Sequence, residues 1–303
     1  MSVIKLRSLW YGLSALVIAA SVVLLVFAGL RLGIDFTGGT LWEIEFMNAR
    51  PEVEAMRAAI APLDLGSVSI QPTGEQGMIL RFRHVTEEEH QALGAAVRHT
   101  GGEFAERRYD TIGPTIGREM ARRSLVAIGL VILLIVSYIA FAFRKVSLPV
   151  ASWKYGIVTV IALLHDVAIP VGFFALAGMF WGYEVDMLAV TAILTILGFS
   201  VHDTIVVFDR VRENLSRRPG DEFSLLVARS VRETLVRSIN TSLTVVLALG
   251  AVWLFGGQST KMFSITLIIG IIAGTYSSIC IASPLLVTWR RWDERRAGRM
   301  RAA

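Results

Sequence analysis

Six apolar segments, each long enough or nearly long enough to cross a lipid bilayer, constrain this chain more than any other feature of its sequence. A hydrocarbon core about 30 Å thick is spanned by about 20 helical residues. The segments cover residues 9–30, 124–143, 155–180, 187–208, 239–255 and 263–289. Because 54% of the residues are hydrophobic and only 18% are charged, we expect an integral membrane protein rather than a soluble domain.

The distribution of Lys and Arg predicts how these spans are oriented. Six spans place both termini on one side, and the connections on that side, which include Arg144 and Lys145, carry 18 basic residues. The short connections on the other side carry Lys261 alone, so the positive-inside rule places both termini in the cytoplasm. The first span resembles a signal peptide but is too long for one, and we expect a retained anchor. The Arg-rich stretches could also bind anionic lipid, although a topology signal is the simpler interpretation.

The long segment between the first two spans, residues 31–123, differs in character because charged residues return and apolar periods of two alternate with helical periods. We expect a small α+β domain with the order β-α-β-β-α-β, the split βαβ or ferredoxin-like arrangement. Its strands are predicted at "LWEIEFM", "GSVSIQP", "GMILRFR" and "EFAERRYDTI", and its helices at "PEVEAMRAAIAPL" and "TEEEHQALGAAVRHT". Thr86 and Glu89 are spaced for a capping box at the start of the second helix.

These patterns divide the chain into four parts. We expect residues 1–32 to hold the N-terminus and first span, residues 33–122 the external domain, residues 123–289 the other five spans with a cytoplasmic loop at 209–238, and residues 290–303 a basic tail. Nothing in the external domain is typical of an enzyme. Its histidines, His84, His90 and His99, lack the spacing of metal ligands. We therefore expect neither catalysis nor a metal site.

Two glycine-rich stretches, "GIDFTGG" at 33–39 and "TIGPTIG" at 111–117, flank the external domain and are interpreted as its hinges. Neither has the Gly-Lys-Ser or Gly-Lys-Thr ending of a phosphate-binding loop. The residues assigned to these hinges are Gly33, Asp35, Gly38, Gly39, Gly113, Pro114 and Gly117.

Two carboxylates lie inside apolar spans, Asp166 on the third and Asp203 on the fourth, and each follows a histidine, His165 or His202. A charge in the middle of a bilayer costs about 2.5–3.5 kcal/mol on insertion scales, so such residues are functional candidates. Neighbouring helical residues point about 100° apart, and we therefore expect the two members of each His-Asp pair not to share a face or bind a metal.

The fifth span carries a polar stripe that could interact with Asp203. Arg237, Asn240, Thr241 and Thr244 recur at helical spacing, so the stripe faces protein or water. One interpretation is a static ion pair between Arg237 and Asp203 that joins two helices. The other is a proton relay, in which movement of the helices changes the proton affinity of Asp203.

Six stretches together resemble the SecF family, the smaller membrane subunits of the SecD–SecF secretion accessory in the resistance-nodulation-division superfamily. They are "GIDFTGGT", "YDTIGPTIGREM", "ALLHDV", "LTILGFSVHDTIVVFDRVREN", "RSINTSLT" and "GTYSSICIASPLL", and they run from about residue 33 to 288. The resemblance implies a machine driven by the proton motive force that works with the SecYEG channel on a translocating preprotein. It also implies a SecD partner that completes a twelve-helix unit.

The resemblance implies that Asp203 and Arg237 belong to the proton path, to which we add Asp166, His202, Asn240 and Thr241. Protons are then the coupling ion, and no other cofactor is expected. The expected location is the plasma membrane of a prokaryote, with lipids as further partners and no nucleic acid.

Three alternatives remain open from the residues. A proton-coupled small-molecule exporter of the same superfamily would share the Asp relay, although this external domain is small for gathering substrates. An intramembrane protease could use Asp166 and Asp203, but Gly-x-Gly-Asp and His-Glu-x-x-His are missing. A noncatalytic scaffold would leave the buried charges unexplained.

Overall fold

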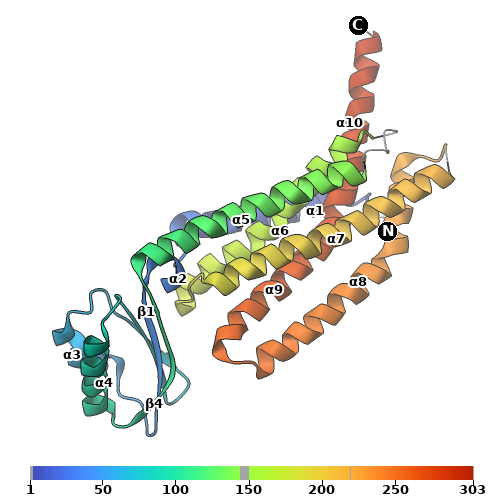
Figure 1. Ribbon diagram of the computed structural model, residues 1–303. Helices are drawn as coiled ribbons and strands as arrows, with labels where there is room; N and C mark the ends of the chain where they lie inside the picture. The colour runs from blue at the N-terminus through green and yellow to red at the C-terminus, as the bar shows by residue number, and fades with distance from the viewer. Residues whose placement is uncertain (1–2, 144–149, 219, 303) are drawn as a thin grey trace. The chain divides into compact units, whose positions relative to one another are not determined.

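The computed structural model describes residues 3–143, 150–218 and 220–302, which form two compact units (Figure 1). The described residues within 1–30, 127–180 and 188–303 form the helical unit, and residues 31–126 together with 181–187 form the external unit. Arg144 and Lys145, which contribute to the basic side of the predicted topology, lie outside the described residues.

The external unit contains the predicted ferredoxin-like domain. Its elements are β1 (Gly39–Phe46), α3 (Val53–Ile60), β2 (Ser69–Thr73), β3 (Gly77–Phe82), α4 (Glu87–Gly101) and β4 (Phe104–Ile112), and a short helix, α2 (Ile34–Thr37), precedes them. The strand order is β2-β3-β1-β4, and each neighbouring pair is antiparallel. Trp42 of the central strand β1 lies opposite Leu80 on one side and Tyr109 on the other. The predicted split βαβ order is therefore confirmed.

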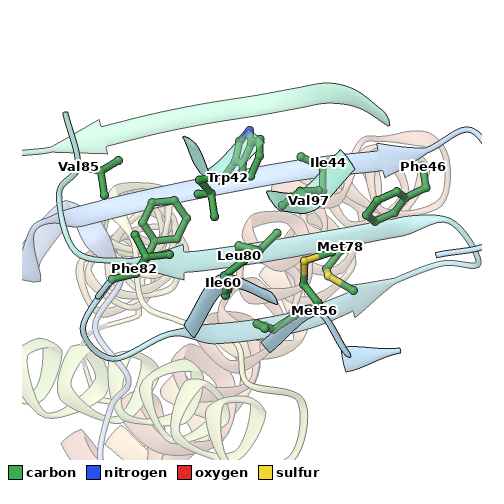
Figure 2. Packing of buried hydrophobic residues seen from close by; sticks show 13 residues of the cluster. Trp42, Ile44, Phe46, Met56, Ile60, Met78, Leu80, Phe82, Val85 and Val97 are labelled. Carbon is green, nitrogen blue, oxygen red and sulfur yellow. The ribbon is translucent and has the colours of Figure 1, made fainter. Parts of the chain in front are cut away.

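The core of this domain follows from the period-two pattern of its strands. In β1 the alternate residues Trp42, Ile44 and Phe46 are buried, because successive strand side chains point to opposite faces. Figure 2 shows these side chains on one face of the sheet, where Met56 of α3 lies beside Met78 of β3. Burying each such side chain contributes about 1.5–3 kcal/mol. The whole core is drawn from residues within the domain itself.

The capping box of α4 is also present. The amide of Glu89 donates to the Thr86 hydroxyl at 3.3 Å, and the amide of Thr86 donates to the Glu89 carboxylate at 2.9 Å. Arg83 forms an ion pair with the same carboxylate at 2.6 Å. The hydrogen bond from Arg83 and that from the Thr86 backbone lower the pKa of Glu89 to about 2.

The segment 181–187, a short connection between the third and fourth spans, belongs to the external unit, which the sequence did not indicate. Val185 forms a parallel bridge with Leu32. The Gly33 amide donates to the Val185 carbonyl at 2.8 Å, and the Val185 amide donates to the Arg31 carbonyl at 2.7 Å. The Gln71 side chain donates to the Gly182 carbonyl at 3.0 Å. The external domain is therefore bonded to this connection, in addition to its two covalent links to α1 and α5.

In the part of the chain that the structure describes, six helical stretches are long and apolar enough to cross a membrane, as predicted. They are α1 (Arg7–Phe27), α5 (Pro114–Ala142), α6 (Ser152–Trp181), α7 (Met187–Arg217), α8 (Phe223–Phe255) and a continuous stretch of α9 (Gln258–Ser277), a π-helical turn (Ser278–Ala282) and α10 (Ser283–Ala302). In Figure 1, α8 and α9 form a long antiparallel hairpin.

Residues 209–238, expected as a loop, are mostly helical because α7 continues to Arg217 and α8 already begins at Phe223. Charged residues at helical spacing stabilise this extension. Arg212 contacts Asp209 at 2.5 Å, and Arg210 of α7 contacts Glu233 of α8 at 2.6 Å. The two helices are thus paired beyond their apolar spans.

Two glycines allow α9 to approach α7 closely. A Cβ atom added to Gly274 would lie 3.1 Å from the Ser200 Cβ, and one added to Gly270 would lie 2.2 Å from the Ile196 Cδ1. Small residues four positions apart permit such close helix packing in membranes. The approach brings the hydroxyl groups of α9 next to the polar residues of α6 and α7.

Candidate functional site

The first buried carboxylate, Asp166 of α6, is fully enclosed and contacts three polar side chains. Its exposed fraction is 0%. Ser277 of α9 donates to the Asp166 Oδ2 at 2.7 Å, and Ser200 of α7 donates to the same oxygen. His165 lies 2.9 Å from the other carboxylate oxygen through its Nδ1. Asp166 therefore joins three membrane helices through short polar contacts.

His165 and Asp166 contact each other, although neighbouring helical positions point about 100° apart. The Asp side chain is short, and the His165 ring turns back far enough for its Nδ1 to contact the carboxylate. The other ring nitrogen, Nε2, is buried without a partner. His202, by contrast, is exposed and has no such contact with Asp203 in the described chain.

The second carboxylate, Asp203 of α7, is less completely compensated. It is 7% exposed and accepts one hydrogen bond, from the Thr275 hydroxyl of α9 at 3.2 Å. Ser238 of α8 lies buried beside it without a hydrogen bond of normal geometry. His202 and Arg237 lie within electrostatic range. Asp203 thus lies between three helices with donors that are near it but not all engaged.

The static ion pair considered for Asp203 and Arg237 is not formed among the residues that the structure describes. Arg237 is exposed, as are Asn240, Thr241 and Thr244. Thr241 instead donates to the Arg237 carbonyl at 2.9 Å, and Thr244 donates to the Asn240 carbonyl at 2.8 Å. The stripe on α8 therefore presents a cation and an amide outward from an apolar helix.

Several site residues were not singled out from the sequence. Ser200, Ser238, Thr275 and Ser277 are residue types common in membrane helices. The run of hydroxyls in "GTYSSICIASPLL" signals Thr275 and Ser277, whereas Ser200 and Ser238 have no signal of their own. The π-helical turn Ser278–Ala282 follows directly, and the Ser278 hydroxyl lies 2.8 Å from that of Thr204. Single π-helical turns inside α-helices occur often at functional sites. Within the described ranges no cluster of three or more His, Cys, Asp or Glu residues could hold a metal ion.

The two glycine-rich stretches lie against each other, so they do not act as independent turns. A Cβ on Gly38 would lie 2.7 Å from the Pro114 Cα, and one on Gly117 would lie 2.7 Å from the Gly38 nitrogen. Gly39, with φ of 133°, would meet the Phe82 carbonyl oxygen at 2.8 Å. Gly113 has open space around it and connects β4 directly to α5, which begins at Pro114. Only glycine permits such close contact between backbones.

Asp35 in the first of these stretches caps a membrane helix. Its carboxylate accepts a hydrogen bond at 2.7 Å from the amide of Met187, the first residue of α7. A carboxylate at a helix N-terminus satisfies a free amide and interacts favourably with the helix dipole. The helix that carries Asp203 therefore begins on a residue of the external unit.

An ion pair between Arg81 of β3 and Glu184 fastens the same connection at 3.0 Å. Both side chains are largely buried. Burial raises the pKa of Glu184, although Arg81 and Arg31 oppose this rise. Burial also lowers the pKa of Arg81, against the opposing effect of Glu184. Forming this pair therefore costs the desolvation of two charged groups, and the pair lies at the junction between the external domain and the start of α7.

The six spans, the ferredoxin-like domain after the first span and the two enclosed carboxylates define a class: a multi-pass helical membrane protein with ionisable groups in its bundle. Residues 92–292 match the family described as "Protein export membrane protein SecD/SecF, C-terminal", and residues 23–46 match the "SecD/SecF GG Motif". The chain belongs to the SecD/SecF family, which confirms the resemblance found in the sequence.

Relatives cover nearly the whole chain. A "Protein translocase subunit SecF" from Thermobaculum terrenum is 46% identical, over 96% of this chain and 94% of its own length. A SecF from Anaerolinea thermophila is 35% identical, over 98% of each chain. A crystal structure of SecDF from Thermus thermophilus, described as a translocon-associated membrane protein, has a TM-score of 0.83 and 30% identity. That match covers 95% of this chain and 38% of the SecDF chain.

Proposed function

We propose that this chain is a SecF-type subunit that couples proton movement through its membrane helices to preprotein translocation. In this proposal it works with a SecD subunit at the SecYEG channel, and both of its termini lie in the cytoplasm of a prokaryotic cell. The names of the relatives support the first part of this proposal, because they are translocase subunits. Protons are the coupling ion, and the chain itself performs no enzymatic step.

The observation that carries the proposal is the difference between the two carboxylates. Asp166 contacts three polar side chains, two of them hydroxyl donors, whereas Asp203 accepts one hydrogen bond. Ser238 and Arg237 lie near Asp203 without a hydrogen bond of normal geometry or an ion pair in the described chain. A buried carboxylate with incomplete compensation can change its protonation when a neighbouring helix moves. Asp203 is therefore the proposed proton carrier, and Asp166, His202, Asn240 and Thr241 are proposed to support the path.

Helix α7 supplies a covalent route from Asp203 to the external domain. It is continuous from Met187 to Arg217, and its first amide is held by Asp35. A shift or rotation of α7 on protonation would therefore act directly on the junction of Asp35, Gly38 and Pro114. Helices behave as stiff elements over this length, and small shifts at one site are often amplified at packed junctions.

A SecD partner is supported by the outward-facing stripe on α8. Arg237 and Asn240 lie on a helix that is apolar enough to span the membrane, and exposing them to lipid would be costly. A polar surface on a partner's helix would cover them and bring further groups to Asp203. The "Protein translocase subunit SecDF" from Brucella abortus also supports such a partner. It is 34% identical over 93% of this chain, and the matched region is 36% of the Brucella protein.

Reconstituted vesicles test the proposal. We expect that Asp203→Asn, in a complex with the SecD subunit and the channel, abolishes the stimulation of preprotein transport by a proton gradient, while transport in the absence of a gradient is unchanged. Asp209→Asn is the matched control, because Asp209 lies on the same helix but is exposed and paired with Arg212. Gradient-dependent transport that survives in Asp203→Asn would contradict the carrier.

A double variant separates a carrier from a structural pair formed with help from the partner. Asp203→Asn with Arg237→Gln removes both charges, so a purely structural pair predicts recovery of assembly and transport. The carrier predicts normal assembly and no gradient-driven step. A small-molecule exporter would lose efflux but leave preprotein transport unchanged in these same variants.

A further inference from the structure

A cavity of about 1140 Å³ opens at the end of the helical unit that carries both termini. Residues 3–5 and the first two residues of α1, Arg7 and Ser8, line one side, and the first turns of α8 line the other. Arg291 of α10 completes the lining. None of these residues takes part in the carboxylate site.

The floor of this cavity is apolar and firmly packed. Ile4 is 4% exposed and belongs to one buried cluster with Val207, Val211, Val227 and Val231. This packing holds the N-terminal segment against α7 and α8. By contrast, Leu225 of α8 lines the cavity and remains 62% exposed. The cavity therefore offers both a fixed floor and an uncovered apolar side chain.

The rim of the cavity is cationic. Its basic residues are Lys5, Arg7, Arg229, Arg232 and Arg291, and its acidic residues are Asp221, Glu222 and Glu233.

Most of the acidic charge is already engaged. Glu233 binds Arg210 at 2.6 Å and Asn214 at 2.9 Å, and Glu222 lies 3.9 Å from Arg291. Lys5, Arg7, Arg229 and Arg232 form no ion pair with any residue that the structure describes. The rim thus holds uncompensated positive charge over an apolar floor.

We propose that this cavity binds one anionic phospholipid, with its phosphate at the basic rim and an acyl chain lying over the apolar floor. Arg229 and Arg232 are three residues apart, so they lie on one face of α8. Guanidinium groups bind phosphate oxygens in a fixed, often bidentate geometry. The cavity lies at the ends of α1 and α8, both membrane-spanning helices, and basic pockets at this level suit lipid headgroups. A soluble phosphate ligand would not require the apolar floor.

Lipid titration of the full chain, followed by native mass spectrometry, tests this proposal. We expect phosphatidylglycerol to be retained on the delipidated protein and phosphatidylcholine to be lost. Arg229→Gln with Arg232→Gln should weaken retention of phosphatidylglycerol by about thirtyfold, since each basic residue near a membrane surface contributes about fivefold to the affinity. Arg229→Lys with Arg232→Lys keeps the charges and should recover most of the binding.

Arg295→Gln with Arg296→Gln is the matched control, because it removes two cations from α10 outside the cavity lining. Equal weakening by this control pair would overturn the proposal, as would equal retention of the two lipids. Competition by sn-glycerol 3-phosphate at the lipid concentration would also overturn it, because the site would then bind free phosphate. The protein could also show no preference between the two lipids and yet release phosphatidylglycerol when an acidic peptide is added. That result would indicate a protein partner instead.

Discussion

The two intramembrane carboxylates differ in how many donors surround them, although they are the same residue type on adjacent helices. Asp166 accepts from Ser277 and Ser200, while Asp203 depends on Thr275. The sequence identified both carboxylates because charges are rare in apolar spans. It could not distinguish them, because Ser and Thr occur throughout membrane helices and their partners depend on packing between distant segments.

Asp35 illustrates a role that sequence pattern does not reveal. Within "GIDFTGG" it was interpreted as part of a hinge, but its carboxylate lies 2.7 Å from the amide of Met187, far along the chain. The position of a capping residue can be predicted only when the cap and the helix are neighbours in sequence. Here the cap joins two regions that the chain brings together only after folding.

Replacing Asp35 with Ala should loosen the start of α7. Loss of a side-chain cap costs about 1 kcal/mol, which corresponds to roughly fivefold faster hydrogen exchange if local opening controls it. We expect this increase at amides of residues 186–190 in the full chain. Asp35→Asn retains an acceptor oxygen and serves as the control. Identical exchange in the Ala and Asn variants would contradict the capping role.

Glu89 should make the external domain sensitive to acid. Its pKa is lowered to about 2 in the folded state, so its contribution to stability is complete above the unfolded pKa of about 4.3. That contribution is lost as the pH falls through the range between about 4.3 and about 2. We expect the melting temperature of a soluble fragment of residues 38–113, which retains the core, to fall across this range.

Glu89→Gln should flatten this part of the pH profile and lower the melting temperature at neutral pH. Glu87→Gln provides the comparison, because Glu87 lies in the same first turn of α4 but accepts from Gln91 at 3.2 Å rather than from Thr86. The same slope in the Glu89→Gln fragment as in the wild-type fragment would show that other carboxylates cause the acid sensitivity.

At the scale of elements, apolar length and periodicity were sufficient to predict the six spans and the β-α-β-β-α-β order. Two features escaped prediction. The π-helical turn Ser278–Ala282 has no signal in the apolar pattern, since one extra residue per turn leaves hydrophobicity unchanged. Residues 209–238 were expected as a loop because charges end a membrane span, yet charges at helical spacing can also extend a helix.

The close approach of α9 to α7 should be sensitive to volume at Gly274. A larger side chain there would meet the Ser200 backbone and lengthen the contacts from Ser277 and Thr275. We expect Gly274→Val to destabilise the bundle by about 1–3 kcal/mol, measured as a lower thermal unfolding midpoint in detergent. Gly198→Val, on α7 with open space around it, is the control. Equal midpoints for the two variants would show that this contact is tolerant.

At the scale of the whole molecule, the proposed interface with a SecD subunit includes the outward stripe of α8. The chain's single cysteine, Cys280, is buried, so an introduced cysteine can be labelled selectively. We expect Thr241→Cys to react with a maleimide in the chain alone and to be protected at least severalfold when a SecD subunit is present. Ala248→Cys, also exposed on α8, gives the baseline for lipid-facing positions. Equal reactivity at position 241 with and without the partner would place the interface elsewhere.

The attachment of residues 181–187 to the external unit has a consequence for biosynthesis. The sheet is complete once β4 has been made, but Val185 and Glu184 are synthesised only after α5 and α6. A nascent chain at that stage carries Arg81 without its ion-pair partner and Leu32 without its bridge. The external domain therefore reaches its final form only when the third span has been inserted, which ties its maturation to correct membrane topology.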